Sequence, residues 1–232
     1  KRNVSKPASG VISIKGSTLE SMGMCKSERF SQQPTAASCS GFLVGEDLLV
    51  TAGHCMQRQS DCNNNKWVFD YKIESKAKAS ISVSESSVYS CKKIINQVLN
   101  NSNQDDFAII QLDRKVTGRR VLDYRRSGKI KKNQDIVVIG HPTGLPTKIA
   151  DGAVVRSLSK KYFSANLDTY GGNSGSAVFN ADTGVIEGIL VRGATDYVYD
   201  SSQGCRVSNV LSNTSGRGED VTYITNIPEL QN

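Results

Sequence analysis

The sequence has no apolar run near the ~20 residues that a membrane-spanning helix requires, and it does not open with a charged segment followed by an apolar one. We therefore predict no membrane span and expect any signal peptide to be missing from this chain. Aromatic residues are also few, at 6%. The basic clusters lack a series of interleaved aromatics, so we expect no nucleic-acid partner despite the net charge of +7. These basic clusters are Arg119, Arg120, Arg125 and Arg126, and Lys129, Lys131 and Lys132.

Metal ligands are equally scarce. There are only two histidines, and none of the six cysteines forms a CxxC pair, which argues against a zinc site. We expect no metal and no cofactor, and we interpret His141, in a Gly-His-Pro turn, as a structural residue with a backbone partner. An even number of cysteines in a chain of 232 residues predicts three disulfides and therefore an oxidising compartment, either outside the cell or in the periplasm.

Short segments rich in Val, Ile, Phe and Tyr recur between turn residues, whereas helical periodicity is scarce. This spacing predicts an all-β fold. The basic stretch at 113–134 divides the chain roughly in half, which favours two barrels joined by a linker. The predicted strands are 41–44, 48–51, 67–73, 107–112, 135–140, 152–158, 177–180, 185–192 and 221–224.

Three segments carry candidate catalytic groups. The sequence GGNSGS at 171–176 can turn tightly and present the Gly172 and Ser174 amides beside the Ser174 hydroxyl. His54 lies where an apolar strand ends in TAGHC, and Asp106 opens the apolar segment DFAII. Asp105 competes with Asp106 but lacks the same register. A serine, a base and a carboxylate that orients the base are the groups that nucleophilic peptide hydrolysis needs.

In the order His, Asp, Ser, these three blocks resemble the signatures of the trypsin and chymotrypsin superfamily, most closely its bacterial branch of glutamyl and lysyl endopeptidases. The resemblance covers residues 39–193. It implies two antiparallel six-stranded β-barrels with the active site in the cleft between them, and a short C-terminal helix. The expected boundaries are an N-terminal arm at 1–38, the first barrel at 39–115, a linker at 116–134 and the second barrel at 135–232.

Two departures from the family pattern concern activation. Asn173 precedes the candidate nucleophile, where animal digestive members carry an aspartate that pairs with a newly freed N-terminus. The chain also opens with Lys1-Arg2 rather than an Ile-Val type start. We therefore expect that zymogen switch to be missing.

The resemblance also suggests how the cysteines pair. It implies a disulfide between Cys39 and Cys55 across the histidine loop. The other four cysteines allow three pairings, of which Cys62 with Cys91 and Cys25 with Cys205 are preferred by similarity to lysyl endopeptidases.

Substrate specificity follows from the same comparison. The floor of the specificity pocket lies six residues before the nucleophile, at Asp168, and a buried carboxylate there would select Lys or Arg. The segment Val191-Arg192-Gly193 is expected to pair with an extended substrate. Arg192 replaces the usual aromatic and would alter the preference if it turned inward onto Asp168 or Asp196.

Leu190 stands where glutamyl-specific relatives carry a histidine, which argues against acidic specificity. The sequence thus predicts a monomeric, secreted or periplasmic serine endopeptidase that cleaves proteins or peptides after Lys or Arg through an acyl-enzyme. Its triad would be His54, Asp106 and Ser174, with an oxyanion hole at Gly172 and Ser174. The alternative is a catalytically silent or gated protein of the same fold that binds one partner, as a toxin would.

Overall fold

The computed structural model describes residues 3–73 and 80–231. Their fold is almost entirely β, which confirms the predicted fold class. Within these residues the one α-helix is α1 (Gln59–Asn64). No helix in the described part of the chain is long and apolar enough to cross a membrane. The short 3-10 turns are Glu20–Met22, Gly53–Cys55, Glu85–Ser87, Pro142–Gly144, Ile224–Asn226 and Pro228–Leu230.

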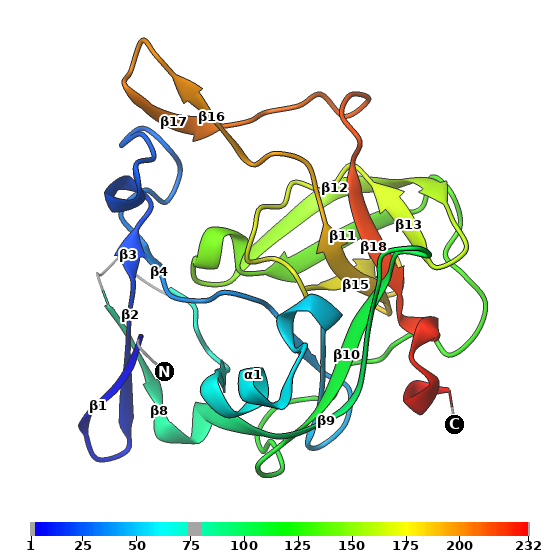
Figure 1. The fold of residues 1–232 in the computed structure, drawn as a ribbon, viewed down its shortest axis with the longest axis horizontal. Helices are drawn as coiled ribbons and strands as arrows, with labels where there is room; N and C mark the ends of the chain where they lie inside the picture. The colour runs from blue at the N-terminus through cyan, green and yellow to red at the C-terminus, as the bar shows by residue number, and fades with distance from the viewer. Residues whose placement is uncertain (1–2, 74–79, 232) are drawn as a thin grey trace.

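The C-terminal half forms a closed antiparallel barrel of six strands, in the order β11-β12-β13-β18-β15-β14 (Figure 1). Alternate residues of β11, such as Ile136 and Val138, face the barrel core, where they pack with Phe163 and Val221. This period of two is what a strand with one buried face requires. The barrel strands are β11 (Asp135–Gly140), β12 (Lys148–Leu158), β13 (Tyr162–Ala165), β14 (Ala177–Asn180), β15 (Ile186–Arg192) and β18 (Glu219–Tyr223).

The N-terminal half differs from the expected closed barrel. Five strands form an open sheet in the order β5-β6-β10-β9-β7, and a separate sheet of three strands has the order β1-β2-β8. The physical reason is that β8 pairs with the N-terminal hairpin instead of closing the five-stranded sheet. The five strands are β5 (Phe42–Leu43), β6 (Leu48–Thr51), β7 (Lys66–Val68), β9 (Val88–Asn100) and β10 (Asp105–Leu112). The three are β1 (Val4–Ala8), β2 (Val11–Lys15) and β8 (Ser80–Ser84).

A shared apolar core fixes the two halves against each other. Phe107 and Ile109 of β10 pack in one buried cluster with Ile189 of β15. Full burial of one such side chain contributes about 1.5–3 kcal/mol. The halves are thereby held in one arrangement, so groups carried by β6 and β10 keep a fixed position relative to groups carried by the barrel.

The C-terminal segment completes this shared core, but it is not the expected helix. It consists of two 3-10 turns, and Ile224, Ile227 and Leu230 are buried between the halves. A 3-10 helix has three residues per turn, so side chains spaced by three lie on one face. Pro228, which has no N–H to donate, begins the second turn and is compatible with that position.

A disulfide joins the N-terminal arm to a hairpin that lies outside the barrel strands. The disulfide Cys25–Cys205 links the N-terminal arm to the hairpin of β16 (Tyr197–Asp200) and β17 (Cys205–Ser208), next to the short pair β3 (Ser17–Thr18) and β4 (Pro34–Thr35) (Figure 1). The other disulfides are Cys39–Cys55 and Cys62–Cys91. All three pairs are those that the resemblance suggested.

Candidate active site

His54 lies in the 3-10 turn that follows β6, and its imidazole is oriented by one carboxylate. Nδ1 of His54 is 2.8 Å from Oδ2 of Asp106, and the His54 backbone N–H donates to Oδ1 of the same side chain at 3.1 Å. Asp106 is 2% exposed, whereas the His54 side chain is 32% exposed. The buried carboxylate therefore holds the ring by two contacts and leaves part of it accessible.

The neighbouring carboxylate, which competed for this role in the sequence, points elsewhere. Asp105 forms an ion pair with Lys161 at 2.9 Å and accepts a hydrogen bond from Asn226 Nδ2 at 2.7 Å. Successive residues of a strand face opposite sides, so only one of the two aspartates in β10 can face His54. The structure brings Asp106 to that position.

The loop that carries Ser174 joins two strands of the barrel and packs against the segment around the histidine turn. The Ser40 N–H donates to the Ser174 carbonyl at 2.8 Å, and the Ser40 hydroxyl donates to the Gly172 carbonyl at 2.9 Å. Cys55 Sγ, in the disulfide next to His54, lies 3.8 Å from the Ser174 carbonyl. The backbone of Ser174 thus contacts Cys55, the last residue of the histidine turn, across the boundary between the two halves.

Within the described residues, no hydrogen bond joins the Ser174 hydroxyl to His54. In proteases without substrate, catalytic hydrogen bonds are often long and shorten only when substrate binds. The amides of Gly172 and Ser174 have no hydrogen-bond acceptor among the described residues, and one residue, Asn173, separates them in the chain. Two adjacent N–H groups without acceptors are what a developing oxyanion needs.

Gly172 is required by the backbone here. Its φ is +90°, and a Cβ at this position would lie 2.6 Å from the His141 carbonyl and 2.8 Å from the Gly144 nitrogen. A side chain at position 172 would therefore collide with the neighbouring loop that contains His141 and Gly144. Asn173 is buried beside it and accepts a hydrogen bond from the Ser176 hydroxyl at 3.3 Å. Lys1 and Arg2 lie outside the described residues.

Asp168 differs from its expected environment. The prediction required a buried carboxylate at the floor of a pocket, but Asp168 is exposed, and it forms neither a hydrogen bond nor an ion pair within the described chain. The residue lies in the segment after β13, where its side chain reaches the surface. Two buried carboxylates lie in this region, Glu219 and Asp220 of β18, and Asp220 is paired with arginines. Sequence reasoning missed Glu219 because nothing near it resembles a motif.

Arg192 also points in a direction that the sequence did not anticipate. Its Nη1 lies 3.8 Å from Oδ2 of Asp106, its Nε donates to Asp220 at 3.3 Å, and its Nη2 donates to the Gln104 carbonyl at 3.0 Å. Among the described residues, Arg192 forms neither a hydrogen bond nor an ion pair with Asp168 or Asp196. The guanidinium thus approaches the carboxylate of the histidine pair instead of the predicted pocket.

The strand segment expected to bind substrate ends in Gly193, which is exposed. Its carbonyl accepts a hydrogen bond from Arg217 Nη1 at 3.2 Å. Val191 is buried in the shared core, so its side chain is structural. Asp196, half-buried, accepts the Gly171 N–H at 2.7 Å and so fixes the start of the loop that carries Ser174. Burial raises the pKa of Asp196, and this hydrogen bond opposes the rise.

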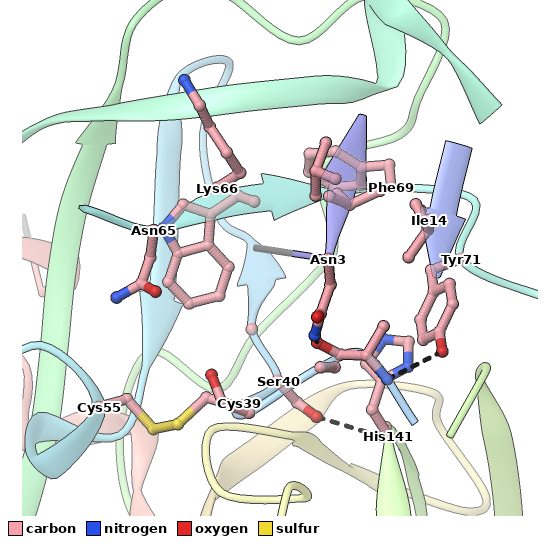
Figure 2. Close-up of a pocket in the computed structure, with 18 of the residues that line it drawn as sticks. Asn3, Ile14, Cys39, Ser40, Cys55, Asn65, Lys66, Phe69, Tyr71 and His141 are labelled. Carbon is pink, nitrogen blue, oxygen red and sulfur yellow. Dashed lines mark hydrogen bonds between the residues drawn. A yellow bond between two sulfur atoms is a disulfide. The ribbon is translucent and has the colours of Figure 1, made fainter. Parts of the chain in front are cut away.

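One cavity has a volume of about 780 Å³. The Cys39–Cys55 disulfide lies on one side of it and Tyr71 and His141 lie on the other (Figure 2). His141 is half-buried, and its Nδ1 lies 3.0 Å from the Leu145 carbonyl, which is the structural arrangement we expected. Burial lowers the pKa of His141. Neither His54 nor Ser174 lines this cavity.

The profile of the trypsin-like peptidase domain matches residues 39–189, which include His54, Asp106 and Ser174. The chain belongs to the trypsin-like peptidase family. A comparison with curated proteins returned no match.

Solved structures similar to this trypsin-like chain include the active form of the Rv3671c protease from M. tuberculosis. That structure is 14% identical with a TM-score of 0.47, and the match covers 79% of this chain and 67% of the other. The inactive form of the same protease, a serine-to-alanine mutant, is also 14% identical, with a TM-score of 0.46 and coverage of 79% and 75%.

Proposed function

We propose that this protein is an exported serine endopeptidase with His54, Asp106 and Ser174 as its catalytic triad. The proposal is supported by the 2.8 Å contact between His54 Nδ1 and the buried Asp106, and by the Gly172 and Ser174 amides, which have no acceptor among the described residues. Export is supported by the three disulfides, which form in oxidising compartments.

In this mechanism Ser174 Oγ attacks the peptide carbonyl carbon while His54 Nε2 takes its proton. Asp106 holds the proton on Nδ1, so that Nε2 is free to accept. The Gly172 and Ser174 amides stabilise the oxyanion. His54 then donates the proton to the leaving amine, and water hydrolyses the acyl-enzyme by the same steps with His54 again acting as base.

We infer that cleavage follows Lys or Arg. The support is the acidic surroundings of the loop that carries Ser174. Asp196 accepts the Gly171 N–H, and Glu219 accepts the Thr169 hydroxyl. Asp168 lines the same cavity as these two residues. A cationic side chain that enters this cavity would meet more negative than positive charge. The resemblance to lysyl endopeptidases favours the same preference.

The test is digestion of a mixed peptide library by the wild-type protein and by Ser174→Ala, with the residue before each cut identified by mass spectrometry. We expect cuts after Lys and Arg that disappear in the variant. Persistent cutting by Ser174→Ala would refute the triad. Cuts after other residues would leave the triad intact and refute the specificity.

A second candidate function is a silent or gated protein of this fold that binds one partner. The absence of a hydrogen bond between Ser174 and His54 in the described structure is the observation that favours it. No cleavage of any library peptide by the wild-type protein, together with capture of one intact protein, is the result expected of this alternative.

A further inference from the structure

Glu219 is a buried carboxylate with no cationic partner. It is 8% exposed, and within the described chain it forms no ion pair. Its two hydrogen bonds come from the Thr169 hydroxyl at 2.7 Å and the Ala194 N–H at 3.1 Å. Removing an ionised carboxylate from water is unfavourable unless an opposite charge compensates it. A cationic ligand that reached Glu219 would supply the missing opposite charge.

The position of Glu219 identifies that ligand. Thr169 is five residues before Ser174, and Ala194 follows the strand β15 that is bonded to the Ser174 loop through Leu190 and Gly175 at 2.7 Å. The Glu219 carboxylate therefore bridges the two segments that flank the Ser174 loop. A side chain inserted between these segments, next to the peptide bond that Ser174 attacks, would meet this carboxylate.

Gly193 leaves room for the Glu219 carboxylate beside the segment 191–193, which is expected to pair with the substrate. A Cβ at Gly193 would lie 1.9 Å from Oε2 of Glu219, so the carboxylate packs directly against the glycine backbone. Any larger residue would displace it. The lack of a side chain at Gly193 is thus what allows Glu219 to occupy this place, beside the segment expected to pair with the substrate.

The charges around Glu219 compensate its negative charge only in part: the charge of Arg217 lowers the pKa of Glu219, but no ion pair forms within the described chain. Arg217 is the near cation, but its guanidinium bonds to Asp220 and to the Gly193 carbonyl. Asp196 adds a second negative charge nearby. Burial raises the pKa of Glu219, against the effect of its hydrogen bonds to Thr169 and Ala194. A bound ammonium or guanidinium would reverse this penalty.

We propose that Glu219, and not the exposed Asp168, is the carboxylate that selects a Lys or Arg side chain before the cleaved bond; this rests on the proposed function. The geometry thereby moves the specificity group from the loop before the nucleophile to the first residue of β18.

The experiment compares Glu219→Gln with Asp168→Asn, since each removes one charge at constant shape. Peptide substrates differ only in carrying Lys, Arg or norleucine before the cut, norleucine being an apolar analogue of Lys. For Glu219→Gln we expect the ratio of kcat/KM for Lys over norleucine to fall by at least about 30-fold, the lower range for loss of one partner of a buried charge pair. For Asp168→Asn we expect the ratio to stay close to that of the wild type.

The opposite pattern, in which Asp168→Asn loses the preference and Glu219→Gln keeps it, overturns the proposal. A wild-type preference for uncharged residues also overturns it while leaving the triad in place. Glu219→Asp, which keeps the charge but withdraws it by one methylene, serves if Glu219→Gln does not fold, and it should lose part of the preference.

A binding measurement separates this inference from the proposed function. Benzamidine, an aromatic amidinium, is titrated calorimetrically into Ser174→Ala protein, which cannot form an acyl-enzyme. We expect binding that Glu219→Gln abolishes in the same background and Asp168→Asn does not. If the wild-type protein cuts no peptide, this arm still decides the role of Glu219, because retained binding by the Glu219→Gln protein refutes it.

Discussion

Replacement of Asp106 by asparagine tests the proposed role of the His54–Asp106 pair most directly, because the structure determines which way the amide must turn. Oδ1 accepts the His54 backbone N–H, which can only donate, and Oδ2 faces Nδ1. In Asp106→Asn the amide oxygen must therefore stay at the backbone N–H, and the NH₂ group faces Nδ1. Nδ1 must then be an acceptor, which moves the ring proton to Nε2, where it blocks transfer from Ser174.

The magnitude follows from the cost of the opposite orientation. Turning the amide would place its NH₂ against the backbone N–H, and a buried donor without an acceptor costs about 1–3 kcal/mol. That bias alone lowers the population of the productive tautomer by about 5- to 160-fold. Loss of the negative charge beside the imidazolium accounts for the rest of a total decrease in kcat near 10⁴-fold, on the order found for such triads.

The assay is steady-state hydrolysis of the best peptide from the library, with near-ultraviolet circular dichroism to confirm the fold. Asp105→Asn is the matched control: its side chain is also buried and adjacent in sequence, but it contacts Lys161 and Asn226 instead of His54. We expect kcat of the control to stay near that of the wild type. The reasoning is wrong if Asp106→Asn keeps more than about one-tenth of the activity, or if Asp105→Asn loses as much.

Three further predictions concern charges outside the His54–Asp106 contact. Arg125→Met should lower the free energy of unfolding by about 3 kcal/mol, because it leaves the fully buried Glu187 without its cation. Scanning calorimetry should then show a melting temperature lower by about 6–12 °C. A double variant with Glu187→Met should recover most of the lost stability. Burial lowers the pKa of Lys148 to about 8, below its usual value of 10.5. Between these values the unfolded state binds the proton and the folded state does not, so the free energy of unfolding should decline as the pH falls from about 10.5 to about 8. Chemical denaturation across this range should show a smaller change with pH for Lys148→Met. Arg192→Leu should reduce kcat, because it removes the cation 3.8 Å from Asp106, and should keep the ratio of kcat/KM for Lys over norleucine. An unchanged kcat with a lost ratio would show instead that Arg192 acts on specificity.

Strand limits were predicted best where apolar residues alternate along a strand and turn residues bound it. The strands 48–51, 135–140 and 177–180 have the predicted limits. In contrast, β9 runs over 13 residues and was missed, because Lys92, Lys93 and other polar residues give its exposed part no hydrophobic period. Pairing across a sheet, not local preference, makes this segment a strand.

The candidate site was predicted as far as local motifs reach. His54, Asp106 and the Ser174 loop lie in short signature segments, so their chemistry could be read from neighbouring residues. Glu219 could not, because its role depends on the approach of Thr169 and Ala194, which are 50 and 25 residues away in the chain. The direction of Arg192 likewise depends on the position of β10 in the other half of the molecule.

The Cys25–Cys205 disulfide has a consequence for a protease that meets its own copies. The bridge closes a covalent ring that contains all three proposed triad residues. A single cut of the backbone anywhere between residues 25 and 205 opens this ring without releasing a fragment, so the nicked molecule migrates as one species until it is reduced. Damage by self-digestion would thus be visible on a reducing gel and hidden on a non-reducing one, and a cut enzyme could retain every group of its active site.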